Sequence, residues 1–176
     1  MDELFGRYRQ DFNEIRRLCL ICHGLDLSTS TLSTEYSTWK LSEPTNITLQ
    51  TLVSSTLLHL AIALRTNLYQ KSIKGSDILL ERSAWLYYDK ELKEAPATLK
   101  QVCDKIIHAD TFSKSRYPGH LSSHEDKIAT QIRGTEQNRK AWTMNLVIDL
   151  LAEDILALLD DIETGEPNRA IHATSA

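Results

Sequence analysis

The residues best suited to chemistry are Asp104 and His108, which lie four positions apart in LKQVCDKIIHAD, residues 99–110. In a helix this spacing places both side chains on one face, which Gln101 and Lys105 share. An imidazole titrates near neutral pH and serves as a general acid or base, and a neighbouring carboxylate orients the ring. The simpler interpretation is a surface pair worth a few tenths of a kcal/mol. The spacing therefore predicts either an acid–base pair or an ordinary pair on a helix surface.

The same segment has the hydrophobic pattern of an amphipathic helix. At about 100° per residue, five apolar side chains fall on one continuous arc, opposite the polar pair. They are Leu99, Val102, Cys103, Ile106 and Ile107. Pro96 precedes them and is tolerated in a first helical turn. We expect a helix that buries this stripe and turns Asp104 and His108 outward.

The run CDKIIH resembles the motif of the HEPN superfamily (higher eukaryotes and prokaryotes nucleotide-binding domain). That motif is an Arg, a polar residue such as Asn or Asp, several further residues and a His. Asp104 and His108 match the polar residue and the His, whereas Cys103 stands at the position of the Arg. The resemblance covers residues 47–109 and 149–163.

The resemblance implies a helical fold, a homodimer with facing motif helices, and a role in a bacterial toxin or phage-defence system with RNA, a protein partner or an antitoxin as ligand. Active members are metal-independent ribonucleases in which His is the acid or base and Arg holds the phosphate. With Cys103 at the Arg position, a non-catalytic dimerisation or RNA- or partner-binding module is favoured. The alternative is an endoribonuclease that uses His108, oriented by Asp104, with an arginine from elsewhere. Candidates for that arginine are Arg65, Arg116 and Arg133.

Basic residues outnumber acidic ones between Lys100 and Lys140, where Tyr117 and Trp142 lie in or near the same stretch. Such a combination is able to bind RNA by charge and stacking, although a mixed-charge solvated surface is the simpler and favoured interpretation. The residues we expect to contact nucleic acid are Gln101, Lys105, Arg116 and Arg133.

Other histidines and cysteines have simpler explanations. Cys19, Cys22 and His23 form a C-x-x-C-H run, the pattern of haem attachment or half a zinc site, but both cysteines also fit the apolar stripe of a first helix. His120 and His124 lack the Glu of H-E-x-x-H and are expected in a solvated loop. A histidine within an apolar helix, His59, is expected in the core or at an interface. We expect neither a metal nor a cofactor.

Hydrophobic periodicity predicts a mainly α protein, a bundle of four to five helices with one antiparallel β-hairpin before the last helix. The expected helices span residues 2–23, 47–70, 78–92, 96–110 and 150–162, and the hairpin spans about 127–148. Segments 27–46 and 111–126 are expected as loops. We assign residues 1–164 to a single domain and 165–176 to a flexible tail.

Composition is that of an ordinary globular protein. The 176 residues carry a formal net charge of -4, which argues against a strongly basic nucleic-acid binder. The N-terminal stretch lacks the apolar core of a signal peptide, and we expect no membrane span and a cytoplasmic location. Three cysteines, an odd number, do not suggest a disulfide framework.

Overall fold

A computed structural model describes residues 11–32, 41–88, 94–116 and 128–165. Within these residues the chain forms four helices and five strands. In chain order they are α1 (Phe12–Leu32), α2 (Glu43–Tyr69), β1 (Ala84–Tyr88), β2 (Ala95–Pro96), α3 (Leu99–Ile107), β3 (Thr111–Arg116), β4 (Ile128–Thr135), β5 (Ala141–Leu146) and α4 (Ile148–Thr164).

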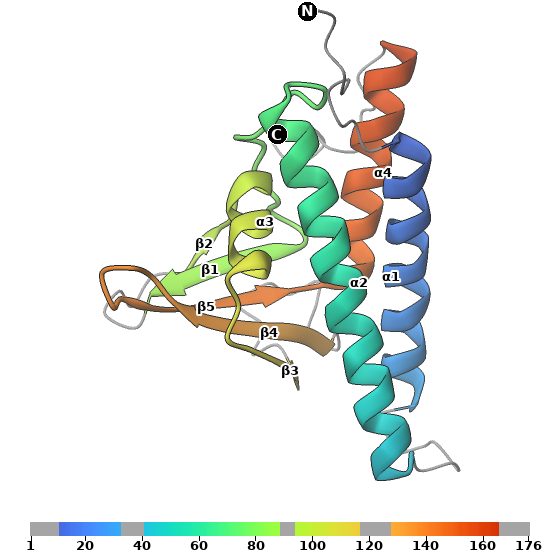
Figure 1. Cartoon of the computed structure of the whole chain (residues 1–176), viewed down its shortest axis with the longest axis vertical. Helices are drawn as coiled ribbons and strands as arrows, with labels where there is room; N and C mark the ends of the chain where they lie inside the picture. The colour runs from blue at the N-terminus through green and yellow to red at the C-terminus, as the bar shows by residue number, and fades with distance from the viewer. Residues whose placement is uncertain (1–10, 33–40, 89–93, 117–127, 166–176) are drawn as a thin grey trace, which may run out of the picture.

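The long helices α1, α2 and α4 lie side by side, and the sheet projects to one side of them with its strands across the helix axes (Figure 1). α3 lies between α2 and the sheet and contacts both α2 and β4. The arrangement is therefore a helical layer and an antiparallel sheet, with the short α3 filling the angle between them.

The strands are ordered β2-β1-β5-β4-β3, and each neighbouring pair is antiparallel. β3, β4 and β5 form a meander, and β5 then pairs with β1, so that Trp85 lies opposite Asn145. On the far side of the same strand, Gly134 lies opposite Trp142. Because β5 is central and paired on both sides, nearly all of its side chains are buried.

The expected helical bundle with one inserted hairpin is wrong, because the protein has an α+β fold. The predicted hairpin exists as β4 and β5, but it forms part of a five-stranded sheet. The segment 78–92, expected as a helix, contains β1, whose AWLYY sequence has the aromatic residues that favour strands. The expected loop 111–126 begins with β3, which hydrogen-bonds along β4.

Three helices lie close to their predicted positions, and the first does not. α3 and α4 occupy the expected segments, and α2 begins a few residues earlier than predicted, because the Ser42 hydroxyl accepts from the backbone N–H of Thr45. α1 begins after Asp11, whose carboxylate accepts from the N–H of Asn13, and runs through Gly24, where the sequence predicts its end. The expected start of that helix before residue 11, and the tail beyond residue 165, lie outside the described residues.

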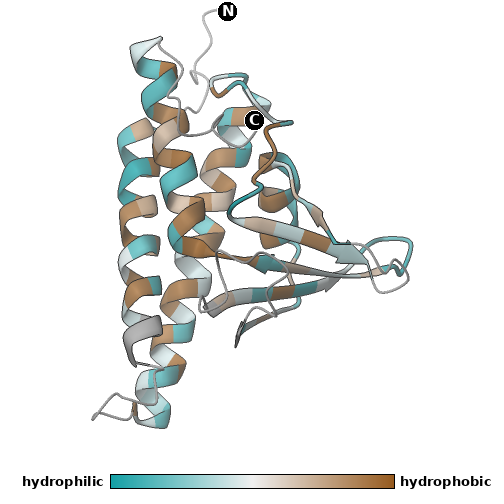
Figure 2. Cartoon of the chain, turned by 180° about the vertical axis from the view of Figure 1, so that it is seen from behind, coloured by the Kyte–Doolittle hydropathy of each residue, from teal (hydrophilic) through white to brown (hydrophobic). Residues whose placement is uncertain are grey.

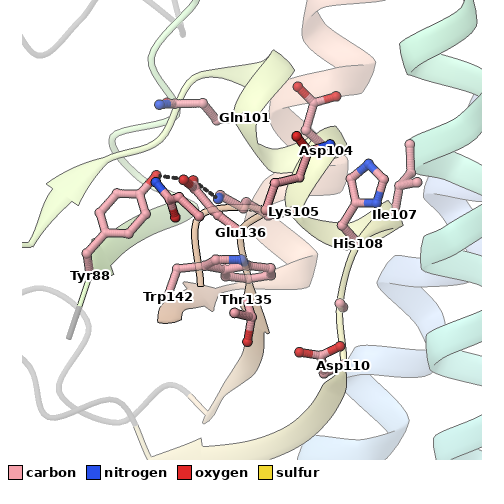
Figure 3. A pocket seen from close by; sticks show the side chains of 13 residues that line it. Tyr88, Gln101, Asp104, Lys105, Ile107, His108, Asp110, Thr135, Glu136 and Trp142 are labelled. Carbon is pink, nitrogen blue, oxygen red and sulfur yellow. Dashed lines mark hydrogen bonds and ion pairs between the residues drawn. The ribbon is translucent and has the colours of Figure 1, made fainter. Parts of the chain in front are cut away.

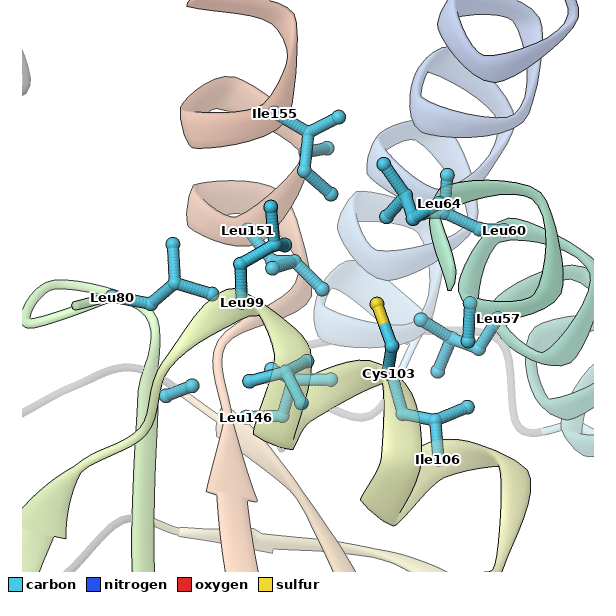
Figure 4. Close-up of a cluster of buried hydrophobic side chains, with 14 of the residues drawn as sticks. Leu57, Leu60, Leu64, Leu80, Leu99, Cys103, Ile106, Leu146, Leu151 and Ile155 are labelled. Carbon is cyan, nitrogen blue, oxygen red and sulfur yellow. The ribbon is translucent and has the colours of Figure 1, made fainter. Parts of the chain in front are cut away.

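The main core lies where α3 meets the long helices and one face of the sheet. Its side chains come from all four helices and from β1, β4 and β5. Figure 4 shows Leu57, Leu99, Cys103, Leu146 and Ile155 converging there. The stripe predicted for α3 is buried at Leu99, Val102, Cys103 and Ile106, and Ile107 packs against its edge. The turn between β4 and β5, which lies away from this core, consists of hydrophilic residues (Figure 2).

Alanine substitutions at two glycines are expected to change the free energy of unfolding in opposite directions. A Cβ at Gly134 would collide with the Trp142 ring and lie 2.9 Å from the His108 carbonyl oxygen, whereas at Gly24 it meets no atom within 4 Å. We expect Gly134→Ala to lower the free energy of unfolding by about 1–3 kcal/mol through overpacking. Gly24→Ala should raise it by about 0.5–1 kcal/mol, since Gly24 lies inside a helix. Urea unfolding measures both, and a Gly134→Ala protein as stable as wild type would contradict the described packing.

Candidate functional site

Both ends of α3 are fixed by local hydrogen bonds. At the start, the Thr98 hydroxyl accepts from the backbone N–H of Gln101, and the Gln101 side chain accepts from that of Thr98, which forms a capping box. At the other end His108 is the C-cap, and its N–H donates to the carbonyl of Asp104. The His108 side chain is therefore exposed at the end of the helix, where the chain turns into β3.

An open depression of about 940 Å³ lies beside this end of α3. Its walls come from α3, the following turn, β1 and the hydrophilic β4–β5 turn (Figure 3). The side chains used below are Tyr88, Gln101, Asp104, Lys105, His108, Asp110, Glu136 and Trp142. The structure thus brings four of the predicted residues, Gln101, Asp104, Lys105 and His108, to one site.

Lys105 does not project into solvent as its helix position predicts, because it is 9% exposed. Its ammonium donates to Glu136 Oε1 at 2.8 Å and lies 4.6 Å from the Trp142 ring centre and 5.2 Å from that of Tyr88. The Tyr88 hydroxyl donates to the same carboxylate oxygen at 2.9 Å. We call Tyr88, Lys105, Glu136 and Trp142 the lysine cage. Its ion pair and cation–π contacts join α3, β1 and the β4–β5 hairpin.

The Glu136 carboxyl is held in its charged form. The hydrogen bond from Lys105, and then that from Tyr88, lower its pKa below the ordinary value of 4.5, because both stabilise the carboxylate. Lys105 is therefore already neutralised within the protein.

Asp104 is bound to an arginine and does not orient His108. Arg65 Nε, from α2, donates to Asp104 Oδ1 at 2.6 Å, and both side chains are about one-third exposed. Among the described residues no side-chain hydrogen bond joins Asp104 to His108. Of Arg65 and Arg133, the named arginines whose side chains the structure describes, Arg65 is thus the one that reaches the motif helix.

Cys103 faces the opposite way from Asp104 and His108. Its side chain is 1% exposed and directed into the core, and burial raises the pKa of its thiol to about 12. An arginine at this position would be buried in the core, away from the depression. The motif position occupied by Cys103 therefore has no access to the site in this fold.

The other expected RNA contacts do not gather at the depression. Arg133 is exposed on β4, where its guanidinium donates to the Gln131 side chain. The backbone of Arg116 belongs to β3, but its side chain lies outside the described residues, as do His120 and His124. Of the residues predicted to contact nucleic acid, Gln101 and Lys105 thus lie at the depression, whereas Arg133 lies on the exposed face of β4.

The C-x-x-C-H segment lies on the inner side of α1. Cys19 and Cys22 are free and buried, and burial raises the pKa of each thiol to about 12, which disfavours the thiolate that binds metal. The Nε2 atom of His23 lies 3.9 Å from Oε1 of Glu153 on α4. No group of three potential metal ligands occurs in the part of the chain that the structure describes. His59 is exposed on α2, so its expected position in the core is wrong, and its position at an interface stays a prediction.

Several site residues have no signal in the sequence. Glu136 lies 31 positions from its partner Lys105, and Arg65 lies 39 positions from Asp104. Tyr88 was expected at a helix position. The excess of aromatic residues at the end of β1 is the one feature that could have indicated it.

Comparison with protein-family models finds no match. No curated protein and no solved structure is detectably similar to the chain either.

The lysine cage predicts an acid-sensitive component of stability. A lowered pKa means that Glu136 stabilises the fold above about pH 4.5 and loses this effect as the pH falls through its folded pKa. At pH 7 Glu136→Gln should lower the free energy of unfolding by about 1 kcal/mol. The difference from wild type should shrink on acidification to pH 3, as measured by urea unfolding. Glu81→Gln, at an exposed position, is the matched control, and a pH-independent difference for Glu136→Gln would contradict the cage.

Proposed function

We propose that this protein is a non-catalytic binding module that accepts a basic side chain of a protein partner in the depression beside α3. The observation that carries the proposal is the charge of the lining. Asp104, Asp110 and Glu136 contribute three carboxylates, of which Asp104 is paired with Arg65 and Glu136 with Lys105, so that Asp110 is the carboxylate of the lining with no cation partner among the described residues. A guanidinium or ammonium entering from outside is therefore attracted by the lining.

Two carboxylates have oxygens left for such a ligand. Lys105 and Tyr88 both donate to Glu136 Oε1, and no described residue donates to its Oε2. Asp110 is exposed, and its own backbone N–H is satisfied by the carbonyl of Arg133 at 2.8 Å. Charge-assisted hydrogen bonds from a partner's arginine suit this pair of acceptors. A protein partner of the antitoxin kind, which the motif resemblance implies, would supply such a side chain.

The same geometry disfavours RNA at this position. A phosphate would meet the carboxylates, and the half-buried ring of Tyr88 is already covered by the ammonium of Lys140 at 4.0 Å. Trp142 is buried beneath Lys105. Bases therefore lack a free aromatic surface in the cage.

Binding of small probes tests the proposal. We expect N-acetylargininamide to shift the NMR signals of the Trp142 indole and His108, with a dissociation constant on the order of 1 mM for so small a ligand. Asp110→Asn should weaken this binding severalfold, and Asp77→Asn, at another exposed aspartate, should not. Adenosine monophosphate is the opposing probe. If it shifts these signals and the arginine derivative does not, the site binds nucleotides and the proposal fails.

One contact favours a second candidate, a metal-independent ribonuclease. RNA cleavage by its own 2′-hydroxyl needs an acid or base near neutrality and a cation at the phosphate. His108 supplies the first, and Arg65, held at Asp104 through Nε, supplies a guanidinium whose two terminal nitrogens have no partner among the described residues. Arg65 would thereby replace the motif arginine that Cys103 lacks.

Incubation with single-stranded RNA in chelator separates the two functions. A non-catalytic module leaves the RNA intact at micromolar protein. Cleavage by wild type that is lost in both His108→Ala and Arg65→Ala, with unfolding transitions unchanged, would establish the ribonuclease and overturn the binding-only function. His23→Ala provides a matched histidine control outside the depression.

A further inference from the structure

We propose that the outward face of α2 is a self-association surface, through which two copies of this chain pair with their α2 helices antiparallel. This surface is separate from the depression, so the inference does not depend on the proposed function. It also differs from the dimer that the motif resemblance implies, because it uses α2 and not the motif helix α3.

The outward face of α2 combines large apolar side chains with Ser, Thr and His, and it carries no charged residue over most of its length. Between Pro44 and Leu64 the sequence contains no Asp, Glu, Lys or Arg. Large side chains on this face are well exposed, with Ile47 at 56%, Leu52 at 48%, Ile62 at 42% and Tyr69 at 82%. Exposed helix surfaces normally carry charges, and a long uncharged stripe marks an interaction site. We call it the α2 stripe, and its members are Ile47, Thr48, Thr51, Leu52, Ser55, His59, Ile62, Thr66 and Tyr69.

The serine and threonine hydroxyls of the α2 stripe are already bonded within the helix. Four hydroxyl groups donate to carbonyl oxygens three or four residues earlier, at 2.8–3.2 Å. The pairs are Thr48 with Pro44, Thr51 with Ile47, Ser55 with Leu52, and Thr66 with Ile62. Removing water from this face therefore leaves these four hydroxyl hydrogens paired, which lowers the usual penalty for burying polar groups.

The border of the stripe favours a protein over a lipid occupant. α2 is the one helix of the described residues that is long and apolar enough, by length and composition, to cross a membrane, but 39% of its most apolar window is already buried in the fold. Glu14 of α1 is paired with Arg17, whose hydrogen bond lowers the Glu14 pKa, and the electrostatic attraction of His59 contributes to the same shift. A protein interface keeps such charges in a wet rim, whereas a bilayer would have to desolvate them.

Charge selects a second copy in the antiparallel orientation. An uncharged face meets itself without like-charge repulsion, as an interface with two-fold symmetry requires. The charged residues of α2 are Glu43 and Arg65, near opposite ends of the helix. An antiparallel pair centred at Ser54 places Glu43 of each copy level with Arg65 of the other, and a parallel pair would place like charges together.

The size of the stripe sets the expected strength. In the pair centred at Ser54 the stripes of the two copies overlap over positions 47–61, about 22 Å at about 1.5 Å per residue, and a helix is about 10 Å wide. Two such surfaces bury on the order of 450 Å², below the roughly 1,200 Å² of stable interfaces. The dimer should therefore form reversibly, with a dissociation constant on the order of 100 µM.

Sedimentation equilibrium between 10 µM and 1 mM tests the proposal directly. The mass of wild type should rise from 20.0 kDa towards twice that value. Leu52→Glu and Ile62→Glu each bring charge into the stripe and should keep the protein monomeric, with unchanged helical circular dichroism. Leu20→Glu is the matched control, because Leu20 is 63% exposed on α1 and should leave association intact.

Cross-linking tests the orientation without destabilising the fold. The native cysteines are buried, so a Cys introduced by Ser55→Cys is the accessible thiol of the described residues. Oxidation should link two copies through position 55. It should not link them through Thr48→Cys, because the antiparallel arrangement separates these positions by about 18 Å. Linking at both positions with equal yield would overturn the antiparallel arrangement.

Three results would overturn self-association itself. The first is a wild-type mass of 20.0 kDa at 1 mM, and the second is a Leu52→Glu protein that associates as wild type does. The third is flotation of monomeric wild type with phosphatidylcholine–phosphatidylglycerol vesicles that Leu52→Glu abolishes, which would assign the stripe to a membrane surface.

Discussion

The buried ammonium of Lys105 is the constraint on which the geometry of the site depends. A lysine that is almost removed from water must be paired, and here one carboxylate and two aromatic rings surround it. These partners come from β1, β5 and the turn after β4, so the cage fixes the polar side of α3 to the sheet while the aliphatic stripe fixes the other side to the core. α3 is thus held on two sides, although it is only nine residues long.

This double attachment explains why the depression lies where it does. With Lys105 and the aliphatic residues of α3 buried, the polar groups that α3 still presents are Lys100, Gln101, Asp104 and, at its end, His108; of these, Gln101, Asp104 and His108 line the depression. The β4–β5 turn reaches over them because Gly134 allows the Trp142 ring to approach. The cage also neutralises Lys105 through its ion pair with Glu136. The carboxylates of the lining therefore determine the sign of the charge that a ligand of the depression would carry.

The sequence is sufficient to place α3, α2, α4 and the β4–β5 hairpin, because each has a local periodic pattern. The five-stranded sheet as a whole could not be predicted from local periodicity. β1 has apolar spacings that also suit a helix, and the polar β3 becomes a strand only by pairing with β4. The candidate site was likewise predictable only for the residues that lie on one helix. Gln101, Asp104, Lys105 and His108 were named from helix spacing, whereas the burial of Lys105 depends on Glu136, a residue with no sequential relation to it.

The apolar character of α2 has two consequences that the sequence alone does not separate. Its composition indicates a helix buried on several sides, and the arc towards α1 and α3 is indeed buried by them. The opposite arc is equally free of charge and yet faces outward, because the sheet extends from the other side of α3 and leaves that arc uncovered (Figure 1). In an isolated chain, the exposed side chains of Leu52 and Ile62 order water at a cost of about 25 cal/mol per Å². Since the hydroxyl groups between them already bond to their own helix, covering the face would recover that free energy with little polar penalty, and only the part that exceeds the entropy lost on association would stabilise the covered state.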